Sequence, residues 1–265
     1  MKRVLGHVLA GLSLLAGVGV AISACAHDNS TLFVQNVLAP QLVTNGNVCV
    51  FTAQPTQTFI SSGVLDVAFR QEYDPTYLVA NQSVPEVNSS QLQTETATVN
   101  IQGAVVRITD AAGKQLTTFT RLAGATIYPA LGGVPSYAPI SVTTLDSTTV
   151  NANLPPAGGT VRLVTYVKFF GQNLGGTSVE SGEFEFPVDL CRGCLINFSP
   201  QDISGCYNAP NCQGSTTSGG QSAATLPEPC IPGQDYAIDC VQCQSIPECH
   251  PNLLPYLCND AGGGG

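Results

Sequence analysis

The chain contains no tryptophan, a single methionine and only three histidines among its 265 residues. Two of the histidines, His7 and His27, lie close to the N-terminus, which leaves His250 as the one candidate for a Ser-His-Asp or Cys-His arrangement. His250 stands between Cys249 and Pro251, a setting typical of an exposed loop. The G-x-S-x-G pattern that positions the serine of many hydrolases is also absent. We therefore expect neither catalysis nor a cofactor.

Charge is equally scarce. Charged residues make up 10% of the chain, and 9 lysines and arginines face 18 aspartates and glutamates, giving a formal net charge of −9. An acidic surface repels phosphate backbones, so we expect no nucleic-acid partner. Hydrophobic residues, at 43%, are too many for a disordered chain, and the abundance of Thr, Ser, Asn and Gln favours an exported β-structure.

The N-terminal segment has the three parts of an export signal. Lys2 and Arg3 form a basic start, residues 4–22 are apolar, and small residues follow in Ile22-Ser23-Ala24-Cys25. This tetrapeptide resembles the lipobox of bacterial lipoproteins. The resemblance implies that residues 1–24 are a cleaved signal peptide and that the Cys25 thiol carries a diacylglyceryl group with palmitate-type acyl chains, which would anchor the protein to a membrane.

Two alternatives to lipidation stay open. The apolar segment is close to the roughly 20 residues that cross a bilayer, so it would serve as an uncleaved anchor. Ala24-Cys25-Ala26 would also permit ordinary secretory cleavage, which would release a soluble protein. We favour lipidation, with residues 25–30 as the tether. Ala26 replaces the aspartate that favours inner-membrane retention in enterobacterial lipoproteins, so the resemblance implies the outer membrane of a bacterial envelope, facing periplasm or cell surface.

The chain between residues 31 and 190 alternates short apolar runs with turn residues. In residues 64–70, Leu65, Val67 and Phe69 share one face of a strand, and Asp66, Ala68 and Arg70 share the other, which predicts one buried and one solvated face. The same reasoning predicts ten strands, over residues 32–38, 48–52, 64–70, 77–80, 97–101, 104–109, 115–121, 140–145, 160–170 and 183–188. Gly113 supplies the positive φ needed to join residues 104–109 and 115–121 as a hairpin.

Ten short strands without a convincing amphipathic helix predict an all-β fold, an antiparallel β-sandwich over residues 31–190. The strand spacing resembles immunoglobulin-like and fibronectin-like modules, although the Cys…Trp…Cys signature of immunoglobulin domains is missing. Residues 123–138 and 146–159 are rich in Gly, Pro, Thr and Asn, so we expect long loops there.

Cysteine is concentrated in a tail over residues 191–260. If Cys25 is lipidated, ten cysteines remain, an even number, and nine of them lie between Cys191 and Cys258. In an oxidising compartment this density predicts a disulfide-rich tail. The ten candidates for disulfides are Cys49, Cys191, Cys194, Cys206, Cys212, Cys230, Cys240, Cys243, Cys249 and Cys258. Within the tail, residues 213–225 indicate a flexible Gly/Ser/Thr linker, and residues 261–265 a disordered Gly-rich end.

The pairs Cys191-x-x-Cys194 and Cys240-x-x-Cys243 also have the spacing of a zinc site or a redox motif. We favour disulfides, because the compartment is oxidising and five further cysteines surround the pairs. Connectivity does not follow from spacing. Cys49 lies alone in a strand, and because Cys191 and Cys194 follow the last strand of the sandwich, we expect Cys49 to pair with one of them.

Other polar residues give weaker signals. Glu183 and Glu185 alternate with phenylalanines, as on the solvated face of an ordinary strand. Asp235 and Asp239 lack the dense acidic pattern of a calcium loop, and we assign them no metal. Tyrosine favours contact surfaces, but we interpret the three that lie near Gly- and Pro-containing loops, Tyr128, Tyr137 and Tyr166, as residues that pack in the sandwich or lie on its surface.

The sequence therefore predicts a lipid-anchored envelope lipoprotein that acts as a structural or binding module. Its partners would be the membrane and an envelope protein or surface ligand. One alternative is a zinc-binding or thiol-disulfide redox protein that uses the tail cysteines. A further alternative is an accessory subunit of an outer-membrane assembly.

Overall fold

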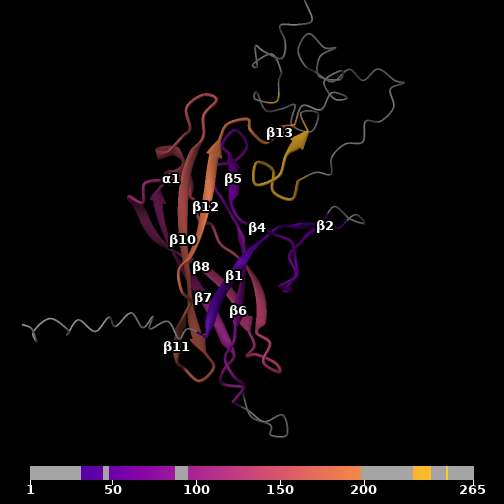
Figure 1. Ribbon diagram of the computed structural model, residues 1–265. Coiled ribbons are helices and arrows are strands. Elements are labelled where there is room, and N and C mark those ends of the chain that lie inside the picture. The colour runs from indigo at the N-terminus through magenta and orange to yellow at the C-terminus, as the bar shows by residue number, and fades with distance from the viewer. Residues whose placement is uncertain (1–30, 44–47, 87–94, 198–228, 240–248, 250–265) are drawn as a thin grey trace, which may run out of the picture.

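The computed structural model describes residues 31–43, 48–86, 95–197, 229–239 and 249 (Figure 1). These residues form an all-β protein, and among them no helix is long and apolar enough to cross a membrane. The elements in chain order are β1 (Leu32–Leu38), β2 (Gln41–Val43), β3 (Val48–Val50), β4 (Phe59–Ile60), β5 (Gly63–Asp66), β6 (Thr76–Asn81), β7 (Val99–Asp110), β8 (Gln115–Ile127), β9 (Ser136–Ser141), α1 (Ser147–Ala152), β10 (Val161–Asn173), β11 (Ser178–Glu180), β12 (Phe184–Cys191), β13 (Ile196–Asn197) and β14 (Ile238–Asp239).

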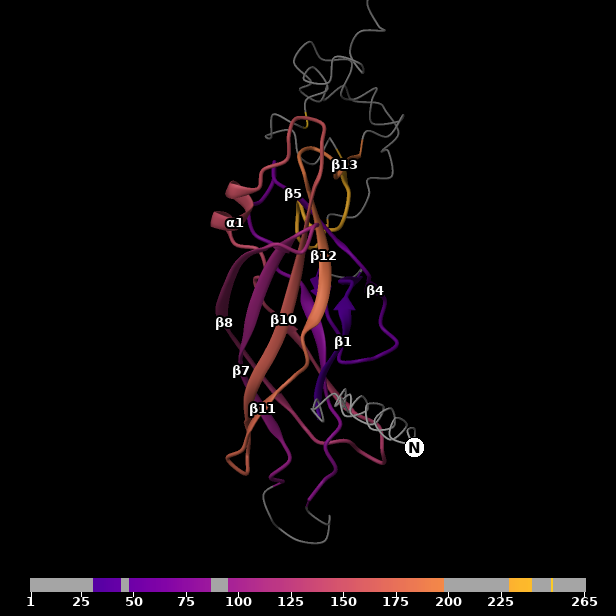
Figure 2. The same ribbon diagram turned by 60° about the vertical axis from the view of Figure 1, so that its left-hand side comes forward.

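Two sheets form the layers of a β-sandwich. One sheet has the order β4-β1-β6-β9, and the other has the order β5-β12-β10-β7-β8, with β11 paired to one end of β10. Figure 2 shows the strands of the second sheet side by side, with β1 and β4 on the opposite side of the molecule. The antiparallel hairpin β2–β3 and the parallel pair β13–β14 are separate from both sheets. The predicted sandwich is therefore confirmed.

The connections between the sheets are those of an immunoglobulin-like fold. The chain crosses from one sheet to the other between β4 and β5 and returns between β5 and β6. It crosses again between β6 and β7, between β8 and β9, and between β9 and β10. The early strand β5 pairs in parallel with β12, whereas the other neighbours within the two sheets are antiparallel. This pairing makes β5 the outermost strand of its sheet, next to the residues where the cysteine-rich tail begins.

Strict alternation along β10 explains how the sandwich forms its core. Leu163, Thr165, Val167 and Phe169 are buried, and the residues between them are partly exposed. The one polar member, Thr165, donates its hydroxyl hydrogen to the carbonyl oxygen of Phe186 at 2.9 Å, so its burial leaves no unmet hydrogen bond. From the facing sheet, Tyr77 packs edge-on against Phe169, with ring centroids 5.5 Å apart. Side chains from both sheets thus fill one shared core.

The structure corrects one strand boundary in the middle of the chain. Residues 97–101 and 104–109, expected as two strands, belong largely to the single strand β7. The register to β8 shifts between Ile101 and Gly103, which marks a β-bulge. A Cβ atom at residue 103 would lie 2.6 Å from the carbonyl oxygen of Arg121, so the bulge requires glycine. The predicted hairpin between β7 and β8 is confirmed, with Gly113 at φ 82°.

Other boundaries differ because tertiary contacts extend or interrupt the local pattern. β8 continues to Ile127 and β9 begins at Ser136, so both ends of the loop expected at residues 123–138 are strand, and the connection is confined to residues 128–135. The loop expected at residues 146–159 contains α1, a short helix capped by Asp146, whose carboxylate accepts a hydrogen bond from the amide of Thr149 at 2.9 Å. The strand expected over residues 64–70 ends at Asp66, which is buried and not solvated.

The two ends of the sandwich carry different parts of the chain. We call one the tether end: it contains Thr31 and the turns over residues 82–86, 128–135 and 173–177. Backbone hydrogen bonds join the amide of Gln82 to the carbonyl of Thr31 and the amide of Ala130 to the carbonyl of Ser83. We call the other the tail end: it contains the ends of β5 and β12 and residues 229–236. In Figure 1, β11 marks the tether end and β13 the tail end.

Candidate functional site

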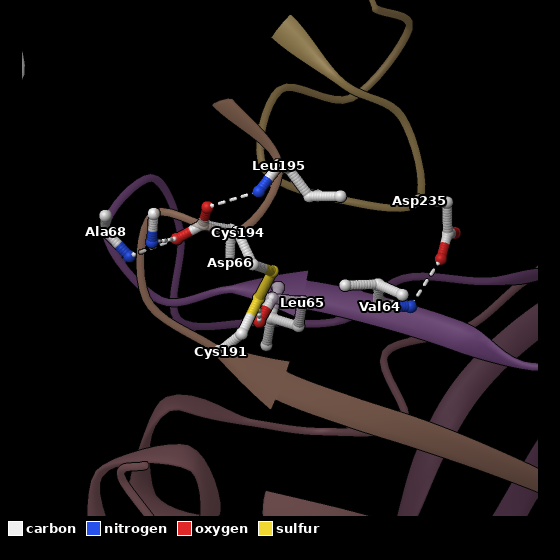
Figure 3. The surroundings of a disulfide bond; sticks show 9 residues. Val64, Leu65, Asp66, Ala68, Cys191, Cys194, Leu195 and Asp235 are labelled. Carbon is white, nitrogen blue, oxygen red and sulfur yellow. Dashed lines mark hydrogen bonds between the residues drawn. A yellow bond between two sulfur atoms is a disulfide. The ribbon is translucent and has the colours of Figure 1, made fainter. Parts of the chain in front are cut away.

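The most concentrated group of reactive side chains lies at the tail end. Asp66, at the end of β5, is fully buried beside a disulfide between Cys191 and Cys194 (Figure 3). Its carboxylate oxygens accept hydrogen bonds from three backbone amides, those of Ala68, Gly193 and Leu195, at 3.1, 2.8 and 3.0 Å. Because these donors come from the turns after β5 and after β12, the carboxylate holds the two turns together.

The same group has the residue types of a metal site. The ligand atoms of Asp66, Cys191 and Cys194 lie within 4.8 Å of one another. Zinc binds cysteine as the thiolate, however, and here both sulfurs are joined in a disulfide. The carboxylate is also engaged by three amides that zinc would have to displace. The described residues therefore fit a disulfide-braced turn better than a zinc site.

A loop over residues 229–236 docks onto the open edge of β5. The amide of Asp66 donates to the carbonyl of Gly233 at 2.9 Å, and the amide of Asp235 donates to the carbonyl of Val64 at 3.0 Å. These bonds continue the sheet beyond its last strand. The buried side chain of Gln234 adds two more bonds, because its amide oxygen accepts from the Asp74 amide at 2.9 Å and its nitrogen donates to the Asp74 carbonyl at 3.1 Å.

We call the contact between residues 229–236 and the edge of β5 the dock. Asp235 is the ionisable residue at its centre. Its Oδ1 accepts a hydrogen bond from the amide of Val64 at 2.8 Å, and the Tyr73 hydroxyl lies 3.0 and 2.9 Å from its two carboxylate oxygens. Figure 3 shows Asp235 pointing back toward Val64. Its φ of 64° is in the left-handed region, where aspartate is one of the few side chains that is readily tolerated. Tertiary contacts thus impose a defined and unusual backbone conformation on the loop.

Burial dominates the electrostatics of this contact. It raises the pKa of Asp235 to about 6, even though the hydrogen bonds from Val64 and Tyr73 favour the ionised carboxylate. Burial, followed by the charge of Asp235, raises the pKa of the Tyr73 hydroxyl well above its usual value. The tyrosine therefore stays protonated and is a permanent donor to Asp235. Protonation of Asp235, by contrast, changes across the mildly acidic range.

The disulfide at the start of this loop corrects the pairing expected for Cys49. Cys49 is bonded to Cys230, across a sequence separation of 181 residues, and Cys191 is bonded to Cys194. The expectation was wrong because β3, which carries Cys49, pairs with β2 outside both sheets and not beside the end of β12. The docking loop reaches this hairpin, so Cys230 supplies the partner.

The remaining predicted residues divide between described and undescribed parts of the chain. Cys249 is buried and disulfide-bonded. Cys25 and five tail cysteines, Cys206, Cys212, Cys240, Cys243 and Cys258, lie outside the described residues, as do the tether, the linker at 213–225, His250 and the Gly-rich end. The solvated face of Glu183 and Glu185 is confirmed. Of the tyrosines, Tyr166 lies beneath the Arg107 guanidinium, 3.9 Å from carbon to ring centroid, and Tyr128 is exposed.

Comparisons with known proteins give no family for this chain. No protein-family model and no curated protein matches it. Among solved structures, one similar chain is described as a late embryogenesis abundant (LEA) protein, with 8% identity and a TM-score of 0.26, covering 59% of this chain and 70% of that chain. So low a similarity supports no argument about fold or function, which must come from the residues themselves.

Sequence reasoning missed the partners that form the dock. Tyr73 lies between predicted strands and gave no signal, and Asp235 was weighed only as a calcium ligand. Two open hollows, of about 430 and 280 Å³, lie on the described surface, the first along residues 67–72 and the second beside Thr31 at the tether end. Neither hollow is lined by Asp235 or Tyr73. The tail end therefore has the geometry of an attachment between two parts of the chain.

Proposed function

We propose that this protein is a lipid-anchored lipoprotein of the bacterial cell envelope, in which a β-sandwich holds a disulfide-rich tail away from the membrane. It acts as a structural or binding module without catalysis. The outer membrane is the proposed location, with the fatty acyl chains on Cys25 as the anchor. The envelope protein or surface ligand that it binds would meet the tail end, where the cysteine-rich segment departs from the sandwich.

The observation that carries the proposal is the position of Thr31 relative to the docked loop. The chain enters the sandwich only six residues after Cys25, at the tether end, whereas Cys230 and Asp235 are attached at the tail end. The longest strands, β8 and β10, have 13 residues each. At about 3.3 Å per residue, a strand of that length spans roughly 40 Å. A rigid sandwich of this size would separate the lipid from the tail.

Disulfides support an exported location independently of the lipobox. Cys49–Cys230 closes a very long loop, and Cys191–Cys194 closes a very short one, and such bonds persist in oxidising compartments. The dock around Asp235 also supports a structural function for the tail, since the side chains of Gln234 and Asp235 form hydrogen bonds with the sandwich.

The experiment is an intact-mass measurement on protein extracted from bacterial membranes without reductant and alkylated under denaturing conditions. We expect a chain that begins at Cys25, carries acyl groups and has no alkylated cysteine. Cys25→Ser is the matched control, because it removes the acylation site and leaves the ten other cysteines unchanged; its mass should include no acyl group. A natural chain whose mass begins elsewhere, or a Cys25→Ser variant that still carries acyl groups, would contradict the anchor.

A second candidate function, thiol-disulfide exchange, is favoured by one observation. The sulfur of Cys194 belongs to an exposed residue, Cys191 is buried, and the Asp66 carboxylate lies within 4.8 Å of both. One accessible sulfur is what an attacking thiolate needs. We rank this function second because the three amides on Asp66 already give that carboxylate a structural role.

The reduction potential of Cys191–Cys194 separates the two functions. The protein is equilibrated in glutathione buffers and alkylated, and the peptide that contains both cysteines is analysed by mass. A structural bond is expected to have a potential below about −300 mV, whereas exchange-active pairs lie between about −270 and −120 mV. A value in the upper range would favour the exchange function.

A further inference from the structure

Exposed apolar side chains are gathered at the tether end. Of the nine large hydrophobic residues that are exposed among the described residues, five lie there: Val84, Tyr128, Leu131, Val134 and Leu174. They come from three separate turns that share this end of the sandwich. We propose that the tether end is a membrane-contact surface whose turns enter the headgroup region of a lipid bilayer. This inference rests on the proposed lipid anchor at Cys25.

The turn between Leu131 and Val134 is the most prominent of the three. Each of these residues donates its amide hydrogen to the carbonyl oxygen of the other, at 2.9 and 3.1 Å, so the two side chains lie on the same face of a two-residue hairpin. The central residues, Gly132 and Gly133, have φ of 60° and 82°, as a type I′ turn requires. This rigid turn presents two aliphatic side chains at its tip, and Leu131 is 82% exposed.

The length of the tether decides which surface covers this end. From Cys25 to Thr31 there are six Cα-to-Cα steps, which reach at most about 20 Å when fully extended. That is about half the roughly 40 Å length of the longest strands. A lipid on Cys25 would therefore keep the tether end close to the bilayer at a high effective concentration, under which a weak apolar contact is sufficient for binding. The tail end would then lie away from the bilayer.

The charge of the tether end indicates the type of lipid contact. Residues 82–86, 128–135 and 173–177 contain no lysine or arginine, and they include the acidic Glu86. An electrostatic attachment to anionic lipid needs clustered cations, so it does not fit this surface. Aliphatic residues together with an exposed tyrosine are instead typical of the interfacial zone, where an aromatic ring with a polar group is favoured. We therefore expect contact with zwitterionic bilayers.

The absence of tryptophan from the chain allows a sharp test. Leu131→Trp and Leu122→Trp each introduce one fluorescent residue at an exposed leucine. Leu122 is 90% exposed but lies within β8, paired to Gly103 and away from the tether end, and is therefore the matched control. Val134→Trp is a second reporter on the same hairpin as Leu131. The full-length acylated proteins are reconstituted into phosphatidylcholine vesicles with and without bromine on the acyl chains.

We expect brominated lipid to quench Leu131→Trp and Val134→Trp at least threefold more strongly than Leu122→Trp. Equal quenching of all three, in protein that floats with the vesicles and carries acyl groups, would overturn the membrane contact while leaving the anchor intact. A blue shift without bromine quenching that grows with protein density would assign this end to contacts between copies, and it would also overturn the inference. Protein that does not float and has an unmodified Cys25 would defeat the proposed anchor and this inference together.

Discussion

Replacing Asp235 by asparagine should make the protein more stable at neutral pH and leave its stability nearly unchanged at pH 4. Burial raises the pKa of this carboxyl group from 3.8 to about 6. Well below pH 3.8 the carboxyl is protonated in both folded and unfolded chains. As the pH rises through 3.8 toward 6 the unfolded chain loses its proton first, so the folded state binds more protons and the free energy of unfolding falls.

The size of this effect follows from the pKa values. A shift of roughly two units corresponds to about 3 kcal/mol, which is an upper limit because Asp235 is partly exposed. Asparagine stays neutral, has almost the same shape, tolerates the left-handed φ and retains an oxygen to accept the Val64 and Tyr73 hydrogen bonds. The stability difference between Asp235→Asn and the natural chain should therefore grow from near zero at pH 4 to at most about 3 kcal/mol at pH 7.

The assay is urea unfolding at several pH values without reductant, followed by tyrosine fluorescence and circular dichroism. Glu185→Gln, an exposed glutamate on the outer face of β12, changes the net charge by the same amount and is the control. Stability differences between each variant and the natural chain are compared at each pH. A difference for Asp235→Asn that stays constant from pH 4 to 7, or that is matched by Glu185→Gln, would refute the reasoning.

Three further outcomes follow from the same contacts. Cys49→Ser should leave Cys230 as a titratable thiol and lower the free energy of unfolding by about 2–4 kcal/mol, because the lost bond closes a long loop; peptide mapping with alkylation that finds the free thiol elsewhere would contradict this pairing. Asp66→Ala should cost about 3 kcal/mol or more in urea unfolding, since three amides lose a buried acceptor, and a loss below 1 kcal/mol would show that water replaces it. Arg107→Ala should cost less than about 1 kcal/mol, because its ion pair with Glu183 is exposed, and a larger loss would show that its packing on Tyr166 matters more.

The sandwich was predictable because its signal is local. Residues 160–170 are rich in β-branched and aromatic residues, which favour a strand without knowledge of its partners, and in the structure Leu163, Val167 and Phe169 alternate with partly exposed neighbours along β10. The strand boundaries were less predictable. β8 extends to Ile127 because it pairs with β7, and the strand propensities of single residues contain no information about such pairing. Residues 146–159 were expected to be a loop, because Thr and Asn are frequent there and favour helices weakly. The cap formed by Asp146 nevertheless begins the helix α1 in this segment.

The dock was beyond sequence reasoning for a different reason. Asp235 meets Tyr73 across 162 residues, and Cys49 meets Cys230 across 181. Neither contact produces a periodic pattern in the sequence, because each depends on which strand of the finished sheet has an open edge. Asp66 was assigned to a solvated face because its neighbours alternate, but β5 ends at that residue and the turn after β12 covers its carboxylate. The alternation of buried and solvated side chains along a strand therefore does not extend to the residue at its end.

The edge of β5 explains why the tail returns to the sandwich at all. As the outermost strand, β5 would present unpaired amide and carbonyl groups, which in other proteins invite strand pairing between molecules. The docked loop forms hydrogen bonds with the amide of Asp66, the carbonyl of Val64 and the amide of Val64. The acceptor for the Val64 amide is the side chain of Asp235. Cys49–Cys230 holds this loop in place covalently. Ionisation of Asp235 at neutral pH weakens the dock, so the disulfide is what keeps the edge covered under those conditions.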